Sequence, residues 1–253
     1  MKNTFILWTV SIIITFLVGY FYNITDSKHP ISSSLFLGDN KITYKFDKVT
    51  SDKNYKVMIY KDTSKLSGNV LWRLNSPDEW KTIAMKDSDK VLYVYLPEIK
   101  PVSKIQYKAL VNYDSKTQQL PPNMVVDMKV IGKVDGSTMS LYYFTLFGGM
   151  LLAVRSALEY FRNNKNTKKI FLFSIALFFA YFIAVDPLKT TLELAALNNS
   201  VPGITQLFHL HPLLILLTSI ITMVILFSLK KKVLPINIIS AVIIILIFLL
   251  VRF

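Results

Sequence analysis

The sequence predicts a membrane protein that combines a five-helix transmembrane part with an extracytoplasmic all-β sandwich domain. Three observations predict this fold class: five strongly apolar stretches, a long polar region between the first two of them, and a period-two pattern within that region. Each apolar stretch is close to the ~20 residues needed to cross a bilayer. The five stretches are Phe5–Phe21, Met139–Phe161, Ile170–Val185, Leu213–Leu229 and Ile236–Val251.

Residues 1–23 are predicted to form an uncleaved signal-anchor helix. A cleaved signal peptide is the alternative, because the segment has a basic start and an apolar run. An A-x-A-like cleavage site is missing, however, and Trp8 at one end with Tyr20-Phe21-Tyr22 at the other is typical of the aromatic belts of a retained span. The serine-rich residues 24–40, which include His29, are predicted to be a flexible linker.

The charge pattern predicts the orientation. The net charge is +13, and eight of the excess cations lie in the short polar segments predicted to be cytoplasmic. These are Lys2, Arg162, Lys165, Lys168, Lys169, Lys230, Lys231 and Lys232. Cytoplasmic segments of membrane proteins carry such an excess, so we expect a multi-pass protein of the cytoplasmic (inner) membrane with its N-terminus inside and its β domain outside. Because most of the excess charge marks orientation, we do not expect nucleic-acid binding.

Residues 41–135 carry the pattern of half-buried strands. In Ile105–Tyr113, apolar residues alternate with polar ones, and turn residues separate this run from similar ones. The predicted strands are Ile42–Phe46, Tyr55–Tyr60, Val70–Leu74, Trp80–Met85, Val91–Leu96, Ile105–Tyr113 and Met124–Val130. About seven short strands favour an antiparallel β-sandwich. The chain has no cysteine, so the domain must fold on its hydrophobic core alone.

Parts of this domain resemble immunoglobulin-like or fibronectin-type-III-like modules of bacterial surface proteins. The resemblance lies in a succession of tryptophan, methionine, leucine-proline and tyrosine-rich strands, in Val70–Arg73, Trp80–Met85, Tyr93–Pro97 and Ile105–Ala109. It implies an immunoglobulin-like fold and no particular ligand. More loosely, the whole chain resembles uncharacterised bacterial inner-membrane proteins with the same order of parts, which implies no activity.

Trp72, Trp80 and the tyrosines of this domain have two interpretations. Aromatic rings can line a carbohydrate-binding face, but they are also favoured in strands and fill sandwich cores. We expect both tryptophans to lie in the core. Whether the outer domain binds protein or carbohydrate stays open at this point.

Residues 139–253 are predicted to be a four-helix transmembrane domain, and its first helix holds two kinds of candidate. Gly149, Ala153 and Ala157 repeat every four residues, a spacing that lets helices pack closely. Arg155 and Glu159 lie one turn apart on another face and can pair. Charged residues within a span are candidates for function, although Arg155 could instead extend to the cytoplasmic interface.

An outer loop at residues 186–212 contains the remaining candidates. Asp186-Pro187 is typical of a helix N-cap followed by proline, and predicts a short helix that ends at Asn198-Asn199. Glu193 lies on that helix. His209 and His211 could offer two metal ligands, but we expect no metal site, because no third ligand is local.

These observations favour a non-enzymatic accessory or scaffold subunit whose outer domain assembles an envelope complex. No P-loop, dinucleotide fingerprint, zinc-protease motif or nucleophile elbow occurs in the sequence. We expect no cofactor, and as partners the lipid bilayer and other membrane or envelope proteins. The alternative is a transport or redox component, associated with metal or haem, that uses Arg155 and Glu159 or His209 and His211.

Overall fold

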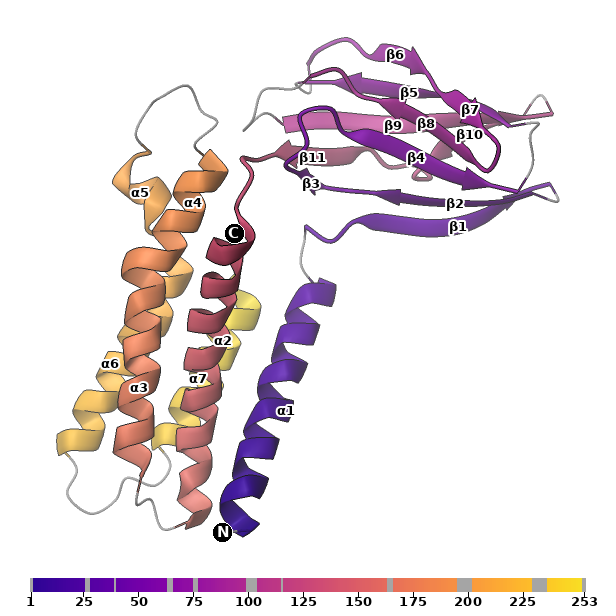
Figure 1. Cartoon of the computed structure of the whole chain (residues 1–253). Helices are drawn as coiled ribbons and strands as arrows, with labels where there is room; N and C mark the ends of the chain where they lie inside the picture. The colour runs from indigo at the N-terminus through magenta and orange to yellow at the C-terminus, as the bar shows by residue number, and fades with distance from the viewer. Residues whose placement is uncertain are drawn as a thin grey trace. The chain divides into compact units, whose positions relative to one another are not determined.

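The computed structural model divides the chain into two compact units, shown as a ribbon in Figure 1. The helical unit comprises Met1–Asp26, Val134–Leu192 and Val201–Phe253, and the β unit comprises Ser27–Lys133 and Glu193–Ser200. The residues that the structure describes are 2–25, 28–38, 40–62, 66–74, 77–98, 104–114, 116–162, 166–194, 202–228 and 236–251. Four predicted features lie outside them: Lys165, Lys230–Lys232, Asn198 and Asn199.

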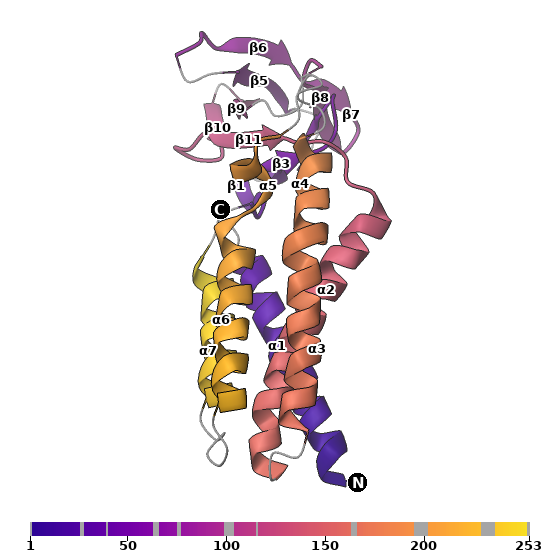
Figure 2. The ribbon, with the colours of Figure 1, turned by 90° about the vertical axis from the view of Figure 1, so that its left-hand side faces the viewer.

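The described part of the helical unit contains six continuous helical segments, where five transmembrane helices and one short helix in the outer loop were predicted. They are α1 (Lys2–Thr25), α2 (Gly136–Leu158) with the 3-10 turn Glu159–Arg162, α3 (Thr167–Ala180) with the π turn Tyr181–Val185 and α4 (Asp186–Leu194), α5 (Ile204–Leu207), α6 (Leu210–Ser228) and α7 (Ile236–Leu250). Figure 2 shows α3 continuing into α4 as one rod. The single turn α5 was not predicted, because it is too short to give a periodic signal.

Four of these segments are long and apolar enough to cross a membrane: Thr4–Thr25, Gly136–Arg162, Thr167–Leu194 and Leu210–Ser228. The prediction of five spans is therefore not met among the described residues. Helix α7 has 15 residues, about 22 Å at 1.5 Å per residue, short of the ~30 Å hydrocarbon thickness.

Pro187 explains why α3 and α4 are continuous. Proline lacks an N–H and its ring crowds the carbonyl one turn earlier. The π turn before it is wider, with the Asp186 N–H bonded to Tyr181 O, and this wider turn accommodates the ring. Asp186 has helical backbone angles, φ −66° and ψ −45°. The prediction that Asp186 caps a separate helix is therefore wrong.

The β unit consists of two sheets that share one hydrophobic core (Figure 1). The first sheet has the order β1-β2-β4-β8-β7, and the second has the order β3-β11-β9-β5-β6 with β10 paired to β9. The strands are β1 Ile31–Leu37, β2 Asn40–Phe46, β3 Val49–Thr50, β4 Lys56–Lys61, β5 Ser67–Arg73, β6 Lys81–Ala84, β7 Lys86–Ser88, β8 Val91–Tyr95, β9 Lys104–Tyr113, β10 Lys116–Leu120 and β11 Val126–Val130. A β-sandwich is thus present.

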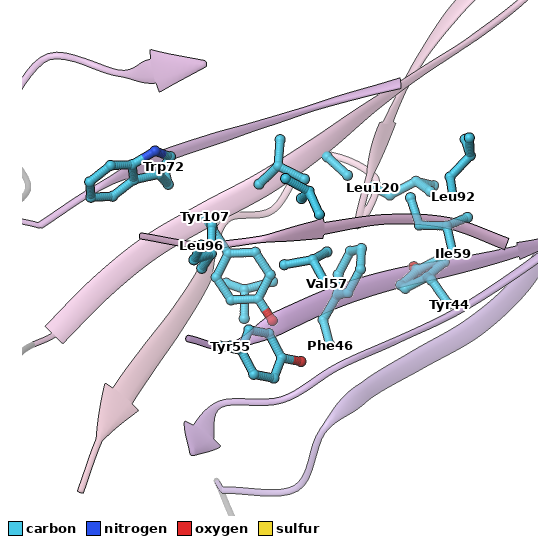
Figure 3. Close-up of a cluster of buried hydrophobic side chains, with 14 of the residues drawn as sticks. Tyr44, Phe46, Tyr55, Val57, Ile59, Trp72, Leu92, Leu96, Tyr107 and Leu120 are labelled. Carbon is cyan, nitrogen blue, oxygen red and sulfur yellow. The ribbon is translucent and has the colours of Figure 1, made fainter. Parts of the chain in front are cut away.

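Alternation along the strands builds the core. In β9 the side chains of Ile105, Tyr107, Ala109 and Val111 are fully buried, whereas the residues between them face outward. Figure 3 shows Tyr107 and Tyr55 with their rings together among aliphatic side chains. The Tyr107 hydroxyl donates to Asp47 O at 3.1 Å. Burial raises the pKa of Tyr107 far above its usual value, and raises that of Tyr55 as well.

The predicted linker 24–40 is wrong over much of its length, because Ile31–Leu37 forms the edge strand β1. It pairs along its whole length with β2, and Leu37 faces Asn40 across a two-residue loop in which Gly38 has φ 61°. Only a glycine adopts that angle without cost. Three consecutive serines conceal the strand, since an edge strand needs few apolar residues.

The predicted strand Trp80–Met85 also divides differently. Lys81–Ala84 is β6, at the edge of the second sheet, and Lys86–Ser88 is β7, at the edge of the first. The chain passes from one sheet to the other at Met85, so the predicted strand corresponds to β6, and β7 is a further strand that was not predicted. Four strands, β1, β3, β7 and β10, account for the difference between about seven predicted strands and the eleven in the described residues.

Candidate functional site

The outward face of the second sheet carries a tryptophan between two cations. The guanidinium carbon of Arg73 lies 4.5 Å from the centroid of the Trp80 ring, and Lys108 Nζ lies 5.0 Å from it. The register explains this grouping. Arg73 faces Gln106 across the β5–β9 pair, and Leu71 faces Lys108, so both cations leave the sheet on the side opposite the core.

A hydrogen-bond chain holds these side chains in place across three strands. Arg73 Nε donates to Gln106 Oε1 at 2.8 Å, and Gln106 Nε2 donates to Asp127 Oδ1 at 2.7 Å. Lys104 and Lys129 are opposite each other on β9 and β11 and also face outward. We name this surface, formed by Arg73, Trp80, Lys104, Gln106, Lys108, Asp127 and Lys129, the Trp80 face.

The prediction that both tryptophans fill the core is correct for Trp72 and wrong for Trp80. Trp72 is 8% exposed and belongs to the core, as Figure 3 shows, with Lys81 Nζ 5.2 Å from its ring. Trp80 is only partly buried. It precedes β6, where the exposed Lys81 pairs with Trp72 and lies on the same side of the sheet, so alternation places Trp80 on the outward side. The alternation of Trp72 with Arg73 in the sequence indicates only that Arg73 faces outward.

The outward face of the first sheet has an aromatic cluster of its own. Lys56 Nζ lies 4.6 Å from the Tyr93 ring and 5.6 Å from the Tyr95 ring. Tyr95 is 53% exposed and Tyr60 49%. Tyrosine is favoured in strands whatever its partners, so this cluster is a weaker indication of binding than an exposed tryptophan between cations.

In the helical unit, Asp186 and His209 form a pair. His209 Nδ1 and Asp186 Oδ2 are 2.8 Å apart. The Asp186 side chain is buried and that of His209 is partly exposed. A buried carboxylate behind an imidazole fixes the ring's orientation and tautomer, so this pair joins the start of α4 to the segment before α6.

His211 does not join His209 at a common point. It lies in the first turn of α6, and its ring centroid is 5.8 Å from that of Phe248. Among the described residues there is no group of three or more His, Cys, Asp or Glu side chains that could hold a metal ion. Glu193 is partly buried near the end of α4, and its backbone oxygen accepts a hydrogen bond from Gly132 N at 2.8 Å.

Two tyrosines link α2 to the π turn. The Tyr181 hydroxyl donates to the Tyr142 hydroxyl at 3.2 Å, and the ring centroids are 5.3 Å apart. Lys189 Nζ lies 4.7 Å from the centroid of the Tyr142 ring. π turns are frequent at functional sites, but here the turn also has the structural cause given by Pro187.

Arg155 and Glu159 form a buried ion pair near the other end of α2. Arg155 Nη2 donates to Glu159 Oε1 at 2.6 Å, and both residues are 1% exposed. The Arg155 guanidinium carbon also lies 5.3 Å from the Trp8 ring of α1. The alternative that Arg155 extends to an interface is therefore wrong, because α1 covers it.

A second group of polar residues, next to this pair in sequence, links α2 to α3 and α7. Asn237 Nδ2 donates to Ser156 Oγ at 3.1 Å, and Ser156 Oγ donates to Thr167 O at 3.2 Å. Four buried atoms nearby lack a hydrogen-bond partner among the described residues: Arg155 Nε, Arg155 Nη1, Glu159 Oε2 and Asn237 Oδ1. Buried polar groups of this kind are usually satisfied by internal water.

The small residues of α2 are at the contact with α3. Ser174 Oγ donates to Gly149 O at 2.6 Å, and a Cβ placed on Gly149 would lie 2.6 Å from Phe178 Cε1. Ala153 and Ala157 are buried as well. This face therefore packs within the chain. The candidate residues of the helical unit form two separate groups, Asp186 with His209 at one end of the helices and Arg155 with Glu159 at the other.

No protein-family model matches this chain, and a search of curated proteins finds no similar sequence. The chain's own geometry is therefore the basis for assigning a function.

Proposed function

We propose that this chain is a non-enzymatic, multi-pass membrane protein of the bacterial inner membrane, and that its immunoglobulin-like β-sandwich lies outside and binds a partner protein. In this role it is an accessory or scaffold subunit of an envelope complex. The membrane location is supported by the four helices that are long and apolar enough to cross a bilayer. The orientation is supported by the cation excess of the short loops.

The observation that carries the binding role is the Trp80 face. Tryptophan, tyrosine and arginine dominate the binding energy of protein interfaces, whereas scattered surface charges contribute little. Trp80 combines a large partly exposed ring with two cations at 4.5 and 5.0 Å. The hydrogen bonds from Arg73 through Gln106 to Asp127 keep the surface ordered before binding, which reduces the entropy lost on association.

The orientation can be tested by cysteine labelling, because the chain has no cysteine of its own. Ser34→Cys lies on the exposed strand β1, and Asn166→Cys lies at the exposed start of α3. We expect a membrane-impermeant maleimide to label Ser34→Cys in intact spheroplasts and to label Asn166→Cys only after lysis. Labelling of both sites before lysis, or the reverse pattern, would contradict the proposed topology.

The binding role can be tested by purification in mild detergent. We expect the full chain to co-purify with a stoichiometric partner, and Trp80→Ala to lose that partner while the helical unit stays folded. Tyr95→Ala, an exposed aromatic on the other sheet, is the matched control and should retain it. A chain that purifies alone and monomeric would refute the scaffold role.

A transport or redox function is the second candidate, and the buried Arg155–Glu159 pair favours it. An ion pair that is 1% exposed within an apolar helix bundle is costly to bury, and such costs are often tolerated for proton or ion movement. Stoichiometric metal or a haem absorbance band in the purified chain would favour this candidate and would direct attention to His209 and His211. Loss of a proton flux in Arg155→Lys, with assembly unchanged, would also favour the transport function.

A further inference from the structure

The helical unit has a second feature, a groove between α1 and α2. Its volume is 790 Å³, within the 300–1,000 Å³ range of small-molecule sites. α1 contributes residues from Ile12 to Asn23, α2 contributes residues from Tyr142 to Leu151, and Phe248 of α7 also lines the groove. Phe248 is held there by stacking on Tyr22, with 4.5 Å between ring centroids.

The two ends of the groove differ in polarity. Tyr20, Tyr22 and Asn23 line one end from α1, and Tyr142 and Tyr143 line the same end from α2. The opposite end is lined by apolar side chains such as Ile12, Phe16 and Leu151, with Thr15 as the one polar residue. A ligand that fits this gradient has a polar end and a long hydrocarbon end.

The length of the groove fits one half of a bilayer. From Ile12 to Asn23, α1 rises about 16 Å, which is close to half of the ~30 Å hydrocarbon thickness. The tyrosine end then corresponds to the interface, where tyrosine rings are enriched. A partner helix that crosses the membrane would need contacts along the full thickness, so this half-length groove favours a lipid over a helix.

We propose that the α1–α2 groove is a binding site for one phospholipid, with an acyl chain between the two helices and the headgroup beside the tyrosines. The inference rests on the proposed membrane location and goes beyond the proposed partner binding. The lipid would fill apolar surface that the chain leaves open and would add to the direct contacts of α1 with the rest of the helical unit, such as that of Gly19 with Phe147.

Thr15 supplies a control variant at the apolar end of the groove. It is 8% exposed, and its hydroxyl has no hydrogen-bond partner among the described residues, whereas the neighbouring Ser11 hydroxyl donates to Leu7 O at 2.7 Å. Because this hydroxyl is buried and not accessible from the groove, Thr15→Val should bind lipid as the natural chain does.

The test uses the full chain in vesicles of phosphatidylethanolamine and phosphatidylglycerol that contain a phospholipid with a photoreactive diazirine in one acyl chain. Adducts are located by mass spectrometry of peptides. We expect labelling of the groove segments of α1 and α2 several-fold above that of the α6–α7 surface groove, which is 340 Å³ and is lined by residues such as Ile221 and Ile239.

Ile12 and Ile13 supply a matched pair of variants. They are 54% and 52% exposed, but only Ile12 lines the groove. Ile12→Trp should fill the apolar end and lower groove labelling about tenfold, the equivalent of roughly 1.4 kcal/mol. Ile13→Trp should leave it unchanged.

Two results would overturn the proposal. Equal labelling of the α1–α2 and α6–α7 grooves would show surrounding lipid only. Unchanged labelling in Ile12→Trp would show that the groove is not the site. Absence of labelling on every helix would instead contradict the membrane location itself, which separates that failure from failure of the lipid site.

Discussion

Replacing Gly149 tests whether the α2–α3 contact holds the helical unit together. A Cβ at this position would lie 2.6 Å from Phe178 Cε1 and 2.7 Å from Cδ1, closer than real Cβ atoms approach other atoms, so one helix must move. The backbone oxygen of Gly149 also accepts a hydrogen bond from Ser174 Oγ at 2.6 Å. Separation of the helices therefore strains the packing and lengthens a buried hydrogen bond.

The magnitude follows from three contributions. Overpacking a tight site costs about 1–3 kcal/mol, and loss of the hydrogen bond adds about 1 kcal/mol. Alanine recovers about 1 kcal/mol over glycine within a helix. Gly149→Ala should thus cost about 1–3 kcal/mol, and a 2 kcal/mol loss lowers Tm by roughly 4–8 °C for a chain of this size.

Two other glycines provide the controls in a thermal melt of the detergent-solubilised chain. A Cβ on Gly148 would lie 3.2 Å from Leu177 Cδ1, the far end of a flexible side chain, and one on Gly136 would meet nothing within 4 Å. We expect Gly148→Ala to keep Tm or raise it by a few degrees, because alanine favours the interior of α2 by up to about 1 kcal/mol, and Gly136→Ala, at the first residue of α2, to leave Tm nearly unchanged. Phe178→Leu combined with Gly149→Ala should restore part of the loss, since contacting residues couple. Equal Tm values for Gly149→Ala and Gly148→Ala would refute the reasoning.

Three further predictions concern buried or capping groups. Arg155→Leu should cost about 3–5 kcal/mol because it leaves the Glu159 charge buried alone, whereas Arg155→Leu with Glu159→Leu should recover most of it; a double-mutant cycle of detergent melts that shows simple additivity would contradict this. Hydrogen bonds from Ser137 and Thr138 hold the pKa of Asp135, the N-cap of α2, well below its usual range. The stability that this cap contributes should therefore be present above pH 4 and be lost as the pH falls below it. Asp135→Ala should not show this pH dependence. Burial raises the pKa of Tyr107, so the stability that it contributes should be complete below pH 10 and fall by about 1.4 kcal/mol per pH unit above it. Hydrogen exchange of β9 should show a shallower loss of stability with pH in Tyr107→Phe. An unchanged dependence on pH would contradict the role given to Tyr107.

Local patterns predicted the two-part organisation and most of the β core. In Ile105–Tyr113 a period of two is enough to assign inward and outward faces, because the pleat alternates side chains strictly. The edge strand Ile31–Leu37 had no such pattern, since β1 needs to bury little, and hydrogen bonds to β2 define it instead.

The candidate site shows what sequence patterns leave out. Alternation from Trp72 could have placed Arg73 outward, but the meeting of Trp80 with Lys108 depends on the pairing of β5 with β9, which brings residues distant in sequence together. The burial of Arg155 likewise depends on Trp8 of α1. Asp186 carried the local signature of a helix cap, but the π turn before Pro187 kept the helix continuous, and His209 became its partner.

Photocrosslinking from the Trp80 face tests the central claim most directly. A photoreactive residue at Thr82, which lies beside Trp80 on the outward side of β6, is compared in the full chain with one at Ser34 on the exposed strand β1. We predict a single partner protein joined to Thr82, absent from Ser34 and lost in Trp80→Ala. A partner joined equally from both positions, or one that persists in Trp80→Ala, would contradict the claim that this face is the binding surface.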